Sequence, residues 1–384
     1  KQLAQTQFLR SWTFHIRFSV YKIYKIEMFP TKHGVIFRTP EQHQPPDDIS
    51  LSGNTYYPNL NSRDYAKRPL NRHIRMHKAW ECISINSEQE AVLATNKLSG
   101  REWSGSLWGF EDIGDGSMLK PSKAAYKLQC QTLVSCLRFV SDNIFIVALR
   151  SGRVQVWSTR SEVRNPQIPY CMFLIGEKCE HMRPVTCLDV MKNVDHAATG
   201  SKDGTLKVWD MGSADLFSIH TFRYAHTDVI TGVAASNTDA SVFATCSFDQ
   251  SALLWDDRLT RPAIALYEKY SSRFKNLAWA ESSDHLLHVG DESGFVHTID
   301  TRVPKEFLQS FKYLNRPIHK ILPKGKIFAV IGDTNLIKIV DENFNTTIYE
   351  NGESENFVRD AVWRGDSDLL TVGFEGRLRV HKIL

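Results

Sequence analysis

Residues 203–210 read Asp-Gly-Thr-Leu-Lys-Val-Trp-Asp, and this stretch decides the fold. It opens on a turn dipeptide, Asp203-Gly204. Leu206 and Val208 then alternate with more polar residues, which is the two-residue period of a half-buried strand. The dipeptide Trp209-Asp210 ends the unit. The stretch therefore predicts a tight turn that leads into a short β-strand.

The same frame recurs along the chain from about residue 80. The positions equivalent to Trp209 are 110, 157, 209, 255, 299, 340 and 381, and their spacings are 47, 52, 46, 44, 41 and 41 residues. A period of about 40–45 residues, with units that end in Trp-Asp, is the signature of WD-repeat β-propellers, whose blades have four strands. We therefore predict an all-β fold, a seven-bladed WD-repeat β-propeller over residues 76–384. An N-terminal extension occupies residues 1–75.

The seventh blade is predicted to lack its outer strand. The sequence ends three residues after the last repeat position, His381. A strand from the N-terminal extension would complete the blade and remove an exposed edge. Val35–Arg38 and Ile74–Met76 are both candidates for this strand, and the sequence does not choose between them.

The composition is ordinary for a globular protein. The chain has 384 residues, of which 42% are hydrophobic and 23% charged, and this mix excludes a disordered, collagen-like or coiled-coil chain. No apolar run reaches the ~18 residues of a membrane helix, so we expect no membrane partner. The seven cysteines form no CxxC pair, which indicates a reducing compartment.

Charge divides the chain into a basic tail and an acidic body. Residues 1–78 carry 13 Lys/Arg against 5 Asp/Glu, whereas residues 79–384 carry 34 against 38. Residues 1–27 are basic, precede the first methionine, Met28, and lack the apolar centre of a secretory signal. We expect them to mark a fragment or a reading frame extended upstream of Met28. A mitochondrial presequence is the alternative.

Two sets of residues have the composition of a hydrolase site. One set comprises His226, Thr245 or Ser247, Asp249 and Trp255, and the other comprises His181, Thr199 or Ser201, Asp203 and Trp209. Because the same residue types recur at repeat positions, we expect a structural role. In that role they form a buried hydrogen-bond network from the histidine to the tryptophan, which satisfies polar groups that are costly to bury alone. We predict no catalytic residues.

Sequence motifs of catalysis and metal binding are missing. The chain contains no GxGxxG, P-loop, GxSxG or HExxH motif. Cys179, His181 and Cys187 do not have the spacing of a zinc site. We therefore expect no cofactor, no metal ion and no enzymatic activity.

One connection between predicted strands differs from the others. Residues 98–105 read Leu-Ser-Gly-Arg-Glu-Trp-Ser-Gly, where other repeats have a short turn. Tryptophan beside arginine is typical of the residues that dominate protein–protein interfaces. The pattern leaves two interpretations open. Either Trp103 is an exposed anchor for a partner, with Ser99, Gly100 and Arg101 beside it, or Trp103 folds back onto the blade.

Charged runs give a second set of candidate binding residues. The acidic run in the last two blades comprises Asp341, Glu342, Glu350, Glu353, Glu355 and Asp360, against Arg359 alone. It either attracts a basic partner or forms a solvated face. The basic stretch over residues 67–78 lacks interleaved aromatic residues for base stacking. We expect a solvated connector there and no nucleic-acid partner.

Several stretches resemble the methylosome protein 50 family of WD-repeat proteins. They are residues 98–108 (LSGREWSGSLW), 225–258 (AHTDVITGVAAS through SVFATCSFDQSALLWDDR), 290–294 and 357–363. Trp-Asp ends are common to WD repeats, whereas the string over residues 98–108 is specific. The resemblance covers residues 80–384, and we see none in residues 1–75.

This resemblance implies a non-enzymatic partner of the type II protein arginine methyltransferase. That enzyme makes symmetric dimethylarginine on Arg/Gly-rich tails of Sm proteins, histones and germline RNA-binding proteins. The family docks on the N-terminal barrel domain of the enzyme and helps to present substrate. The first-blade tryptophan that inserts into the enzyme matches Trp103, and a neighbouring contact residue matches Arg101. We therefore expect a scaffold in a cytoplasmic and nuclear hetero-oligomer, which binds basic Arg/Gly-rich protein tails.

A second function class stays open. Trp255-Asp256-Asp257-Arg258 fits the WDxR pattern of propellers that act as substrate receptors of cullin-type ubiquitin ligases. The pattern is short and frequent in propellers, and Arg258 can equally cap its own turn.

Overall fold

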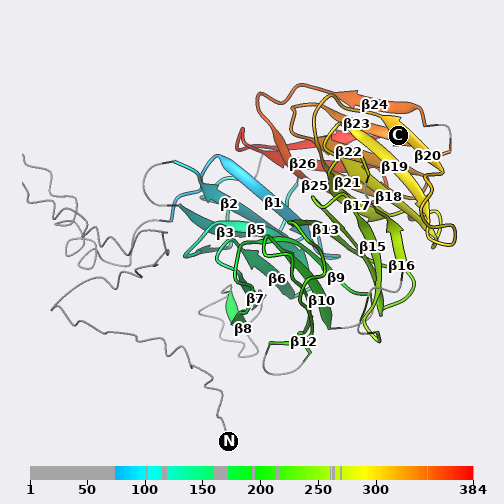
Figure 1. The fold of residues 1–384 in the computed structure, drawn as a ribbon. Coiled ribbons are helices and arrows are strands. Elements are labelled where there is room, and N and C mark those ends of the chain that lie inside the picture. Colours follow the sequence, from blue (N-terminus) through cyan, green and yellow to red (C-terminus); the bar gives the residue numbers. More distant parts are fainter. Residues whose placement is uncertain are drawn as a thin grey trace, which may run out of the picture. The chain divides into compact units, whose positions relative to one another are not determined.

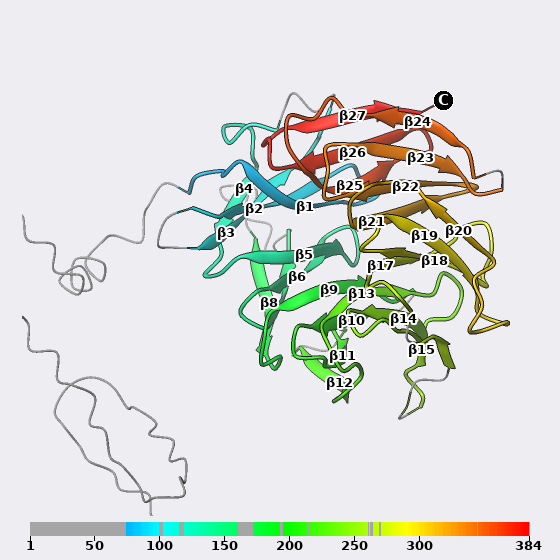
Figure 2. The same ribbon diagram turned by 45° about the horizontal axis from the view of Figure 1, so that its top comes forward.

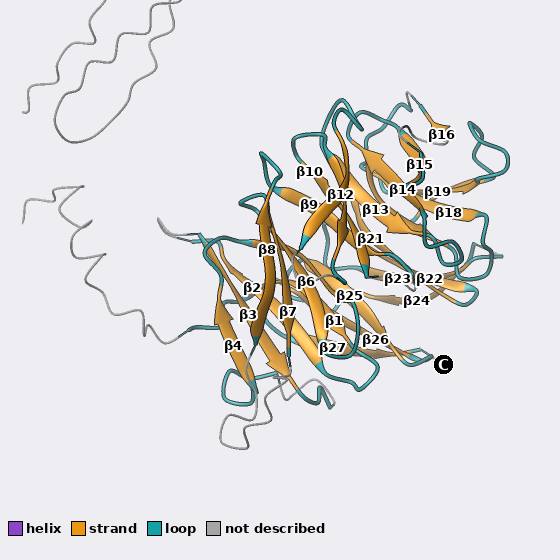
Figure 3. Ribbon diagram, turned by 90° about the horizontal axis from the view of Figure 1, so that it is seen from below, coloured by secondary structure: helices purple, strands orange, loops and turns teal. Residues whose placement is uncertain are grey.

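The computed structural model describes residues 74–99, 103–114, 119–159, 172–192, 195–212, 216–259, 261, 264–268, 270–343 and 345–383. These residues form seven antiparallel sheets, each of which is one blade of a propeller (Figure 1). In the part of the chain that the structure describes, all regular elements are strands (Figure 3). None of the described residues belongs to a helix that could cross a membrane.

The strands of each blade follow one another in sequence order, from the innermost outward. Blades 1 to 3 comprise β1 (Ala79–Ile85), β2 (Ala91–Lys97), β3 (Ser104–Phe110) and β4 (Tyr126–Gln129); β5 (Val134–Phe139), β6 (Ile144–Leu149), β7 (Arg153–Ser158) and β8 (Phe173–Cys179); and β9 (Val185–Val190), β10 (His196–Ser201), β11 (Leu206–Asp210) and β12 (Phe217–Phe222). Blades 4 and 5 comprise β13 (Ile230–Ala235), β14 (Val242–Ser247), β15 (Ala252–Asp256) and β16 (Ile264–Tyr267); and β17 (Phe274–Trp279), β18 (Leu286–Asp291), β19 (Phe295–Asp300) and β20 (Gln309–Lys312). Blades 6 and 7 comprise β21 (Ile318–Lys324), β22 (Ile327–Gly332), β23 (Ile337–Asp341) and β24 (Thr347–Asn351); and β25 (Val358–Arg364), β26 (Asp368–Gly373) and β27 (Leu378–Lys382).

Burial of the side chains decreases from the inner to the outer strands of a blade. The second strand of a blade, such as β10 or β14, is buried on both faces because neighbouring blades cover it. Outer strands such as β20 are exposed and polar. One apolar cluster joins Phe222 of blade 3 to Phe243 and Trp255 of blade 4, so the core lies between blades.

The ring closes where the first blade meets the last. The innermost strand β1 contacts both β5 of blade 2 and β25 of blade 7, and Figure 2 shows the blue first strand beside the red last blade. Blade 7 has three strands among the described residues. Ile74–Met76 does not supply a fourth, because residues 74–77 form no strand. Ile74 and Met76 instead pack against the apolar cluster of Trp80 and Val372, which explains their alternation. Val35–Arg38 lies outside the described residues.

The first repeat has the register that its spacing predicted. Phe110 pairs across its ladder with Ala91, as Trp209 pairs with Ala197. Ala91 and Ala197 occupy the same place in their blades, because each lies opposite the third residue after the first residue beyond the bulge, Ile85 or Val190. Phe110 is buried, so it takes the place of the tryptophan in this blade.

A β-bulge recurs at the same place in each innermost strand. One extra residue interrupts the ladder, and in the seven blades it is Glu81, Ser135, Thr186, Thr231, Lys275, His319 or Arg359. All seven residues line the central channel of the propeller. A bulge re-aims a side chain, so each blade contributes one side chain to a ring at this level of the channel.

Candidate protein-binding site

Blade 4 contains the complete polar network that the sequence predicted. Nδ1 of His226 lies 2.9 Å from Oδ2 of Asp249, and its Nε2 lies 2.8 Å from the hydroxyl of Thr245. The indole N–H of Trp255 donates to the same hydroxyl at 2.7 Å. His226, Thr245 and Trp255 are buried. The structure thus selects Thr245 over Ser247 as the residue in this network.

Blade 3 contains a variant of this network. The hydroxyl of Thr199 accepts from the indole of Trp209 at 2.7 Å and lies 2.8 Å from Nε2 of His181. Nδ1 of His181 reaches Thr205 at 2.7 Å, and the hydroxyl of Thr205 donates to Asp203. The aspartate–histidine link therefore passes through a hydroxyl, because Nδ1 of His181 is 3.9 Å from Asp203.

The electrostatics of these residues fit a structural role. Burial lowers the pKa of His181 from 6.5 to about 4, so the imidazole is neutral near pH 7. Burial alone would raise the pKa of Asp249, but hydrogen bonds from His226 and Ser251 hold it well below its usual range. The threonine hydroxyl is already engaged by a tryptophan and a histidine, which leaves it poorly placed to act as a nucleophile.

The first-blade connection presents Trp103 to solvent. The Trp103 side chain is 58% exposed, so it is not folded back onto the blade, and Leu98 at the other end of the connection is 39% exposed. Ser99 is exposed as well, whereas Gly100 and Arg101 lie outside the described residues. The connection joins β2 to β3 at the end of the blade where β1 begins.

The base of this connection is fixed against blade 2. The backbone N–H of Gly105 donates to the carbonyl of Thr132 at 2.9 Å. The side chain of Asn96 exchanges two hydrogen bonds with the backbone of Val134, at 2.9 and 3.0 Å. A Cβ on Gly105 would lie 2.9 Å from the Thr132 carbonyl oxygen, so this close approach requires glycine. Trp103 therefore projects from a firmly anchored base.

The structure divides the acidic run between two ends of blade 6. The strands β23 and β24 are antiparallel, with Lys338 opposite Glu350. Asp341 and Glu342 follow β23 at one end, whereas Glu353 and Glu355 follow β24 at the other. The strand length between them, at ~3.3 Å per residue, separates the two groups by roughly 10–15 Å.

Several carboxylates of the run have partners within the propeller. The six carboxylates of the run therefore do not form one free patch. Glu342 contacts Ser282 and His288. Glu350 pairs with Lys338 at 3.2 Å, and Glu353 lies 3.9 Å from Arg379.

The WDxR arginine folds onto its own turn. The guanidinium of Arg258 contacts Asp256 at 2.6 and 2.7 Å, and its backbone N–H donates to the same carboxylate at 3.0 Å. Arg302 and Asp300 repeat this arrangement in blade 5. Because the arrangement recurs one blade later in a sequence that lacks the WDxR motif, turn capping accounts for the position of Arg258.

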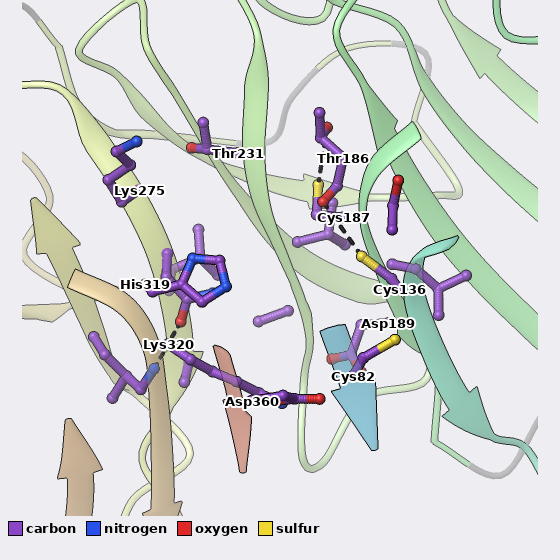
Figure 4. Close-up of a pocket in the computed structure, with 18 of the residues that line it drawn as sticks. Cys82, Cys136, Thr186, Cys187, Asp189, Thr231, Lys275, His319, Lys320 and Asp360 are labelled. Carbon is purple, nitrogen blue, oxygen red and sulfur yellow. Dashed lines mark hydrogen bonds and ion pairs between the residues drawn. The ribbon is translucent and has the colours of Figure 1, made fainter. Parts of the chain in front are cut away.

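A central channel with a volume of about 650 Å³ runs between the innermost strands. Figure 4 shows Cys82, Cys136 and Cys187 on one side of it, opposite His319 and Lys320. Burial raises the pKa of the Cys136 thiol to about 12, so this thiol is protonated at neutral pH. Among the described residues, no group of three or more His, Cys, Asp or Glu side chains could hold a metal ion.

Sequence reasoning missed the residues of this channel. They are scattered along the chain and share no motif. The one signal was a polar residue near the start of each innermost strand, such as Glu81, Lys275 or Arg359, directly after an apolar residue.

Comparison with known proteins identifies the family. The WD domain, G-beta repeat model matches residues 174–210 and 217–256. Protein valois of Drosophila melanogaster is 37% identical over 369 residues, which cover 93% of this chain and all of valois. The chain belongs to the methylosome protein 50 family. Residues 76–384 make up only about four fifths of the chain, whereas the match to valois covers 93% of it. The match therefore extends into residues 1–75, where the sequence motifs showed no resemblance.

Two further relatives show how far the likeness extends. Methylosome protein WDR77 of Xenopus laevis is 24% identical over 327 residues, which cover 82% of this chain and 93% of that protein. GATOR2 complex protein WDR24 of Danio rerio is 25% identical over 196 residues, but the match covers 22% of that protein. Similarity along almost the whole length is thus shared with the methylosome proteins and not with the GATOR2 component.

Proposed function

We propose that this chain is a non-enzymatic scaffold subunit of a methylosome-like complex and that it binds the type II protein arginine methyltransferase. The observation that carries the proposal is the 58% exposed Trp103 on its anchored connection, in a chain that matches valois along its length. An exposed tryptophan on a fixed base loses little conformational entropy when it enters a pocket on a partner. Ser99, Gly100 and Arg101 complete the proposed contact.

The absence of catalysis is part of this proposal. The Ser/Thr, His and Asp side chains that resemble a hydrolase site are engaged in two buried structural networks, around Thr199 and Thr245. The purified chain should therefore show no methyl transfer or hydrolysis, and activity should depend on the partner enzyme.

We also propose that the scaffold helps to present basic Arg/Gly-rich tails. The excess of carboxylates over cations in residues 79–384 supports this part, as do the exposed Glu350, Glu353 and Glu355. Replacing these three glutamates with lysine should raise the KM for such a tail and leave assembly with the enzyme intact. Unchanged kinetics would assign tail binding to the enzyme alone.

Affinity purification of the full chain, followed by mass spectrometry, tests the proposed assembly. We expect the type II arginine methyltransferase and its substrates. Recovery of a ubiquitin-ligase adaptor without the methyltransferase would instead support the receptor function. Fluorescent fusions test whether the complex occurs in both cytoplasm and nucleus, as the family membership leads us to propose.

A further inference from the structure

We propose that one mouth of the central channel is a binding site for an acidic polypeptide segment. This mouth is at the end of the propeller where the innermost strands begin. The corner residues Arg150, Lys202 and Phe248 mark it, because their backbone N–H groups bond to carbonyls directly before β5, β9 and β13. The connection that carries Trp103 lies at the same end of blade 1. The proposed site does not use Trp103, so its test is independent of the scaffold function.

Positive charge is in excess at this mouth. Four cationic side chains line it at the level of the bulges and corners: Arg150, Lys202, Lys275 and Arg359. The one carboxylate at this level of the lining is Glu81, and the two arginines share it, at 3.8 and 3.0 Å. Arg359 has a second partner on the rim, Asp333, at 3.2 Å.

The two lysines of the mouth are available for a ligand. Within the residues that the structure describes, neither Lys202 nor Lys275 has a carboxylate at ion-pair distance. Lys202 is exposed, and Lys275 is half-buried with its ammonium 4.7 Å from the centre of the Phe248 ring. An ammonium that lacks a counter-charge in a low-dielectric channel gains more from a bound anion than one on an open surface does.

Deeper in the channel, the charges are matched. Lys320 contacts Asp360, and Arg138 lies 3.8 Å from Asp189. At the far end, Glu281 accepts a hydrogen bond from the backbone of Gly325. The excess of cations is therefore confined to one mouth. The two ends of the channel differ in charge, and an anion is favoured at the end that carries the excess cations.

One exposed apolar side chain lies near Lys202. Met182 is 92% exposed, and its backbone N–H donates to Asp203, the sequence neighbour of Lys202. An exposed apolar side chain near a cationic opening suits a peptide that carries both carboxylates and an apolar residue.

A polypeptide fits this mouth better than RNA does. Single-stranded RNA needs free aromatic faces for stacking, but Lys275 and Arg273 both lie over the ring of Phe248. The carboxylates of Asp203 and Asp333 on the rim would also repel a continuous phosphate backbone. A short segment with a few negative charges can avoid them.

Fluorescence anisotropy with the full chain tests the proposal. The probe is a labelled peptide of about twelve residues in which glutamates alternate with serines around one leucine. A second arm uses phosphoserine in place of glutamate, a third replaces glutamate with lysine, and a fourth uses a labelled RNA of similar length. We expect saturable binding of the glutamate or the phosphoserine peptide, weakened by about 300 mM NaCl, and no binding of the lysine peptide.

Two double variants make the test specific. Lys202→Glu with Lys275→Glu should raise the Kd of the acidic peptide about tenfold or more, because attraction becomes repulsion. Lys127→Glu with Lys178→Glu makes the same change of charge on the exposed outer strands β4 and β8 and should leave the Kd nearly unchanged. Stronger binding of the phosphoserine peptide would identify phosphate as the source of the charge. Equal losses in both double variants, no saturable binding of either acidic peptide, or binding of RNA alone would overturn the proposal.

Discussion

The carboxylate of Asp360 accepts a hydrogen bond of 2.9 Å from the backbone N–H of Ile83, and this bond joins the last blade to the first across 277 residues. The same carboxylate contacts the ammonium of Lys320 in blade 6. One buried aspartate therefore connects blade 7 to both of its neighbours. Since the described residues give blade 7 only three strands, such side-chain contacts contribute directly to closure of the ring.

Removal of this carboxylate should open the ring. We expect Asp360→Ala to lower the free energy of unfolding by about 3–5 kcal/mol, because it leaves the buried Lys320 without its counter-charge. Asp360→Asn should have a smaller effect, since the amide oxygen can still accept from Ile83. Urea denaturation measures both. Asp366→Ala is the control, because the Asp366 side chain is 98% exposed; a loss as small as that of the control would contradict this role of Asp360.

The buried network of blade 4 should be equally sensitive. Thr245→Val keeps the shape of the side chain but leaves the indole N–H of Trp255 and one imidazole nitrogen of His226 without a partner. We expect a loss of about 2–4 kcal/mol in the free energy of unfolding. Thr227→Val, at an exposed position, should be close to neutral. If the two variants had the same stability, the network would contribute nothing.

The pKa of His181 is lower in the folded protein than in the unfolded one. The free energy of unfolding should therefore fall as the pH decreases from 7 to 5. The unfolded imidazole takes up a proton near pH 6.5, whereas the folded one does so near pH 4, because burial disfavours its charged form. The unfolded state thus binds more protons between these values. We expect His181 to account for a loss of about 2 kcal/mol between pH 7 and pH 5. An NMR titration of the His181 ring checks the cause, and a midpoint near 6.5 would refute it.

Arg258 of the WDxR pattern and the equivalent Arg302 of blade 5 should contribute equally to stability. We expect Arg258→Ala and Arg302→Ala to lower the unfolding temperature by similar small amounts, because each removes the same turn clamp. Neither should change the set of proteins that co-purify with the chain. Loss of a captured ligase adaptor with Arg258→Ala alone would reverse this assignment and support a ubiquitin-ligase receptor.

The sequence could predict the features that repeat. Each blade shows the two-residue period of its strands, so the count of seven and the paired polar networks followed from spacing. The first repeat followed from spacing as well, although Phe110 stands there in place of a tryptophan. Exposure of Trp103 could not be read from the pattern, since a tryptophan between glycines can fold either way.

Features that depend on contacts between distant blades could not be predicted in this way. The acidic run looked continuous in the sequence, but antiparallel pairing carries Glu342 and Glu353 to opposite ends of blade 6. Asp360 counted as part of that run, yet it is 4% exposed and closes the ring. Which bulged residues meet in the channel depends on ring geometry, and no local pattern encodes it.

Binding of the purified type II arginine methyltransferase to Trp103→Ala tests the central claim most directly. Isothermal titration calorimetry would compare this variant with the wild type and with Phe311→Ala, which removes an exposed aromatic side chain from the outer strand β20. We predict that Trp103→Ala raises the Kd by about tenfold to a hundredfold or more, while circular dichroism shows an intact fold and Phe311→Ala binds as the wild type does. Wild-type affinity of Trp103→Ala would contradict the assignment of this connection as the docking site.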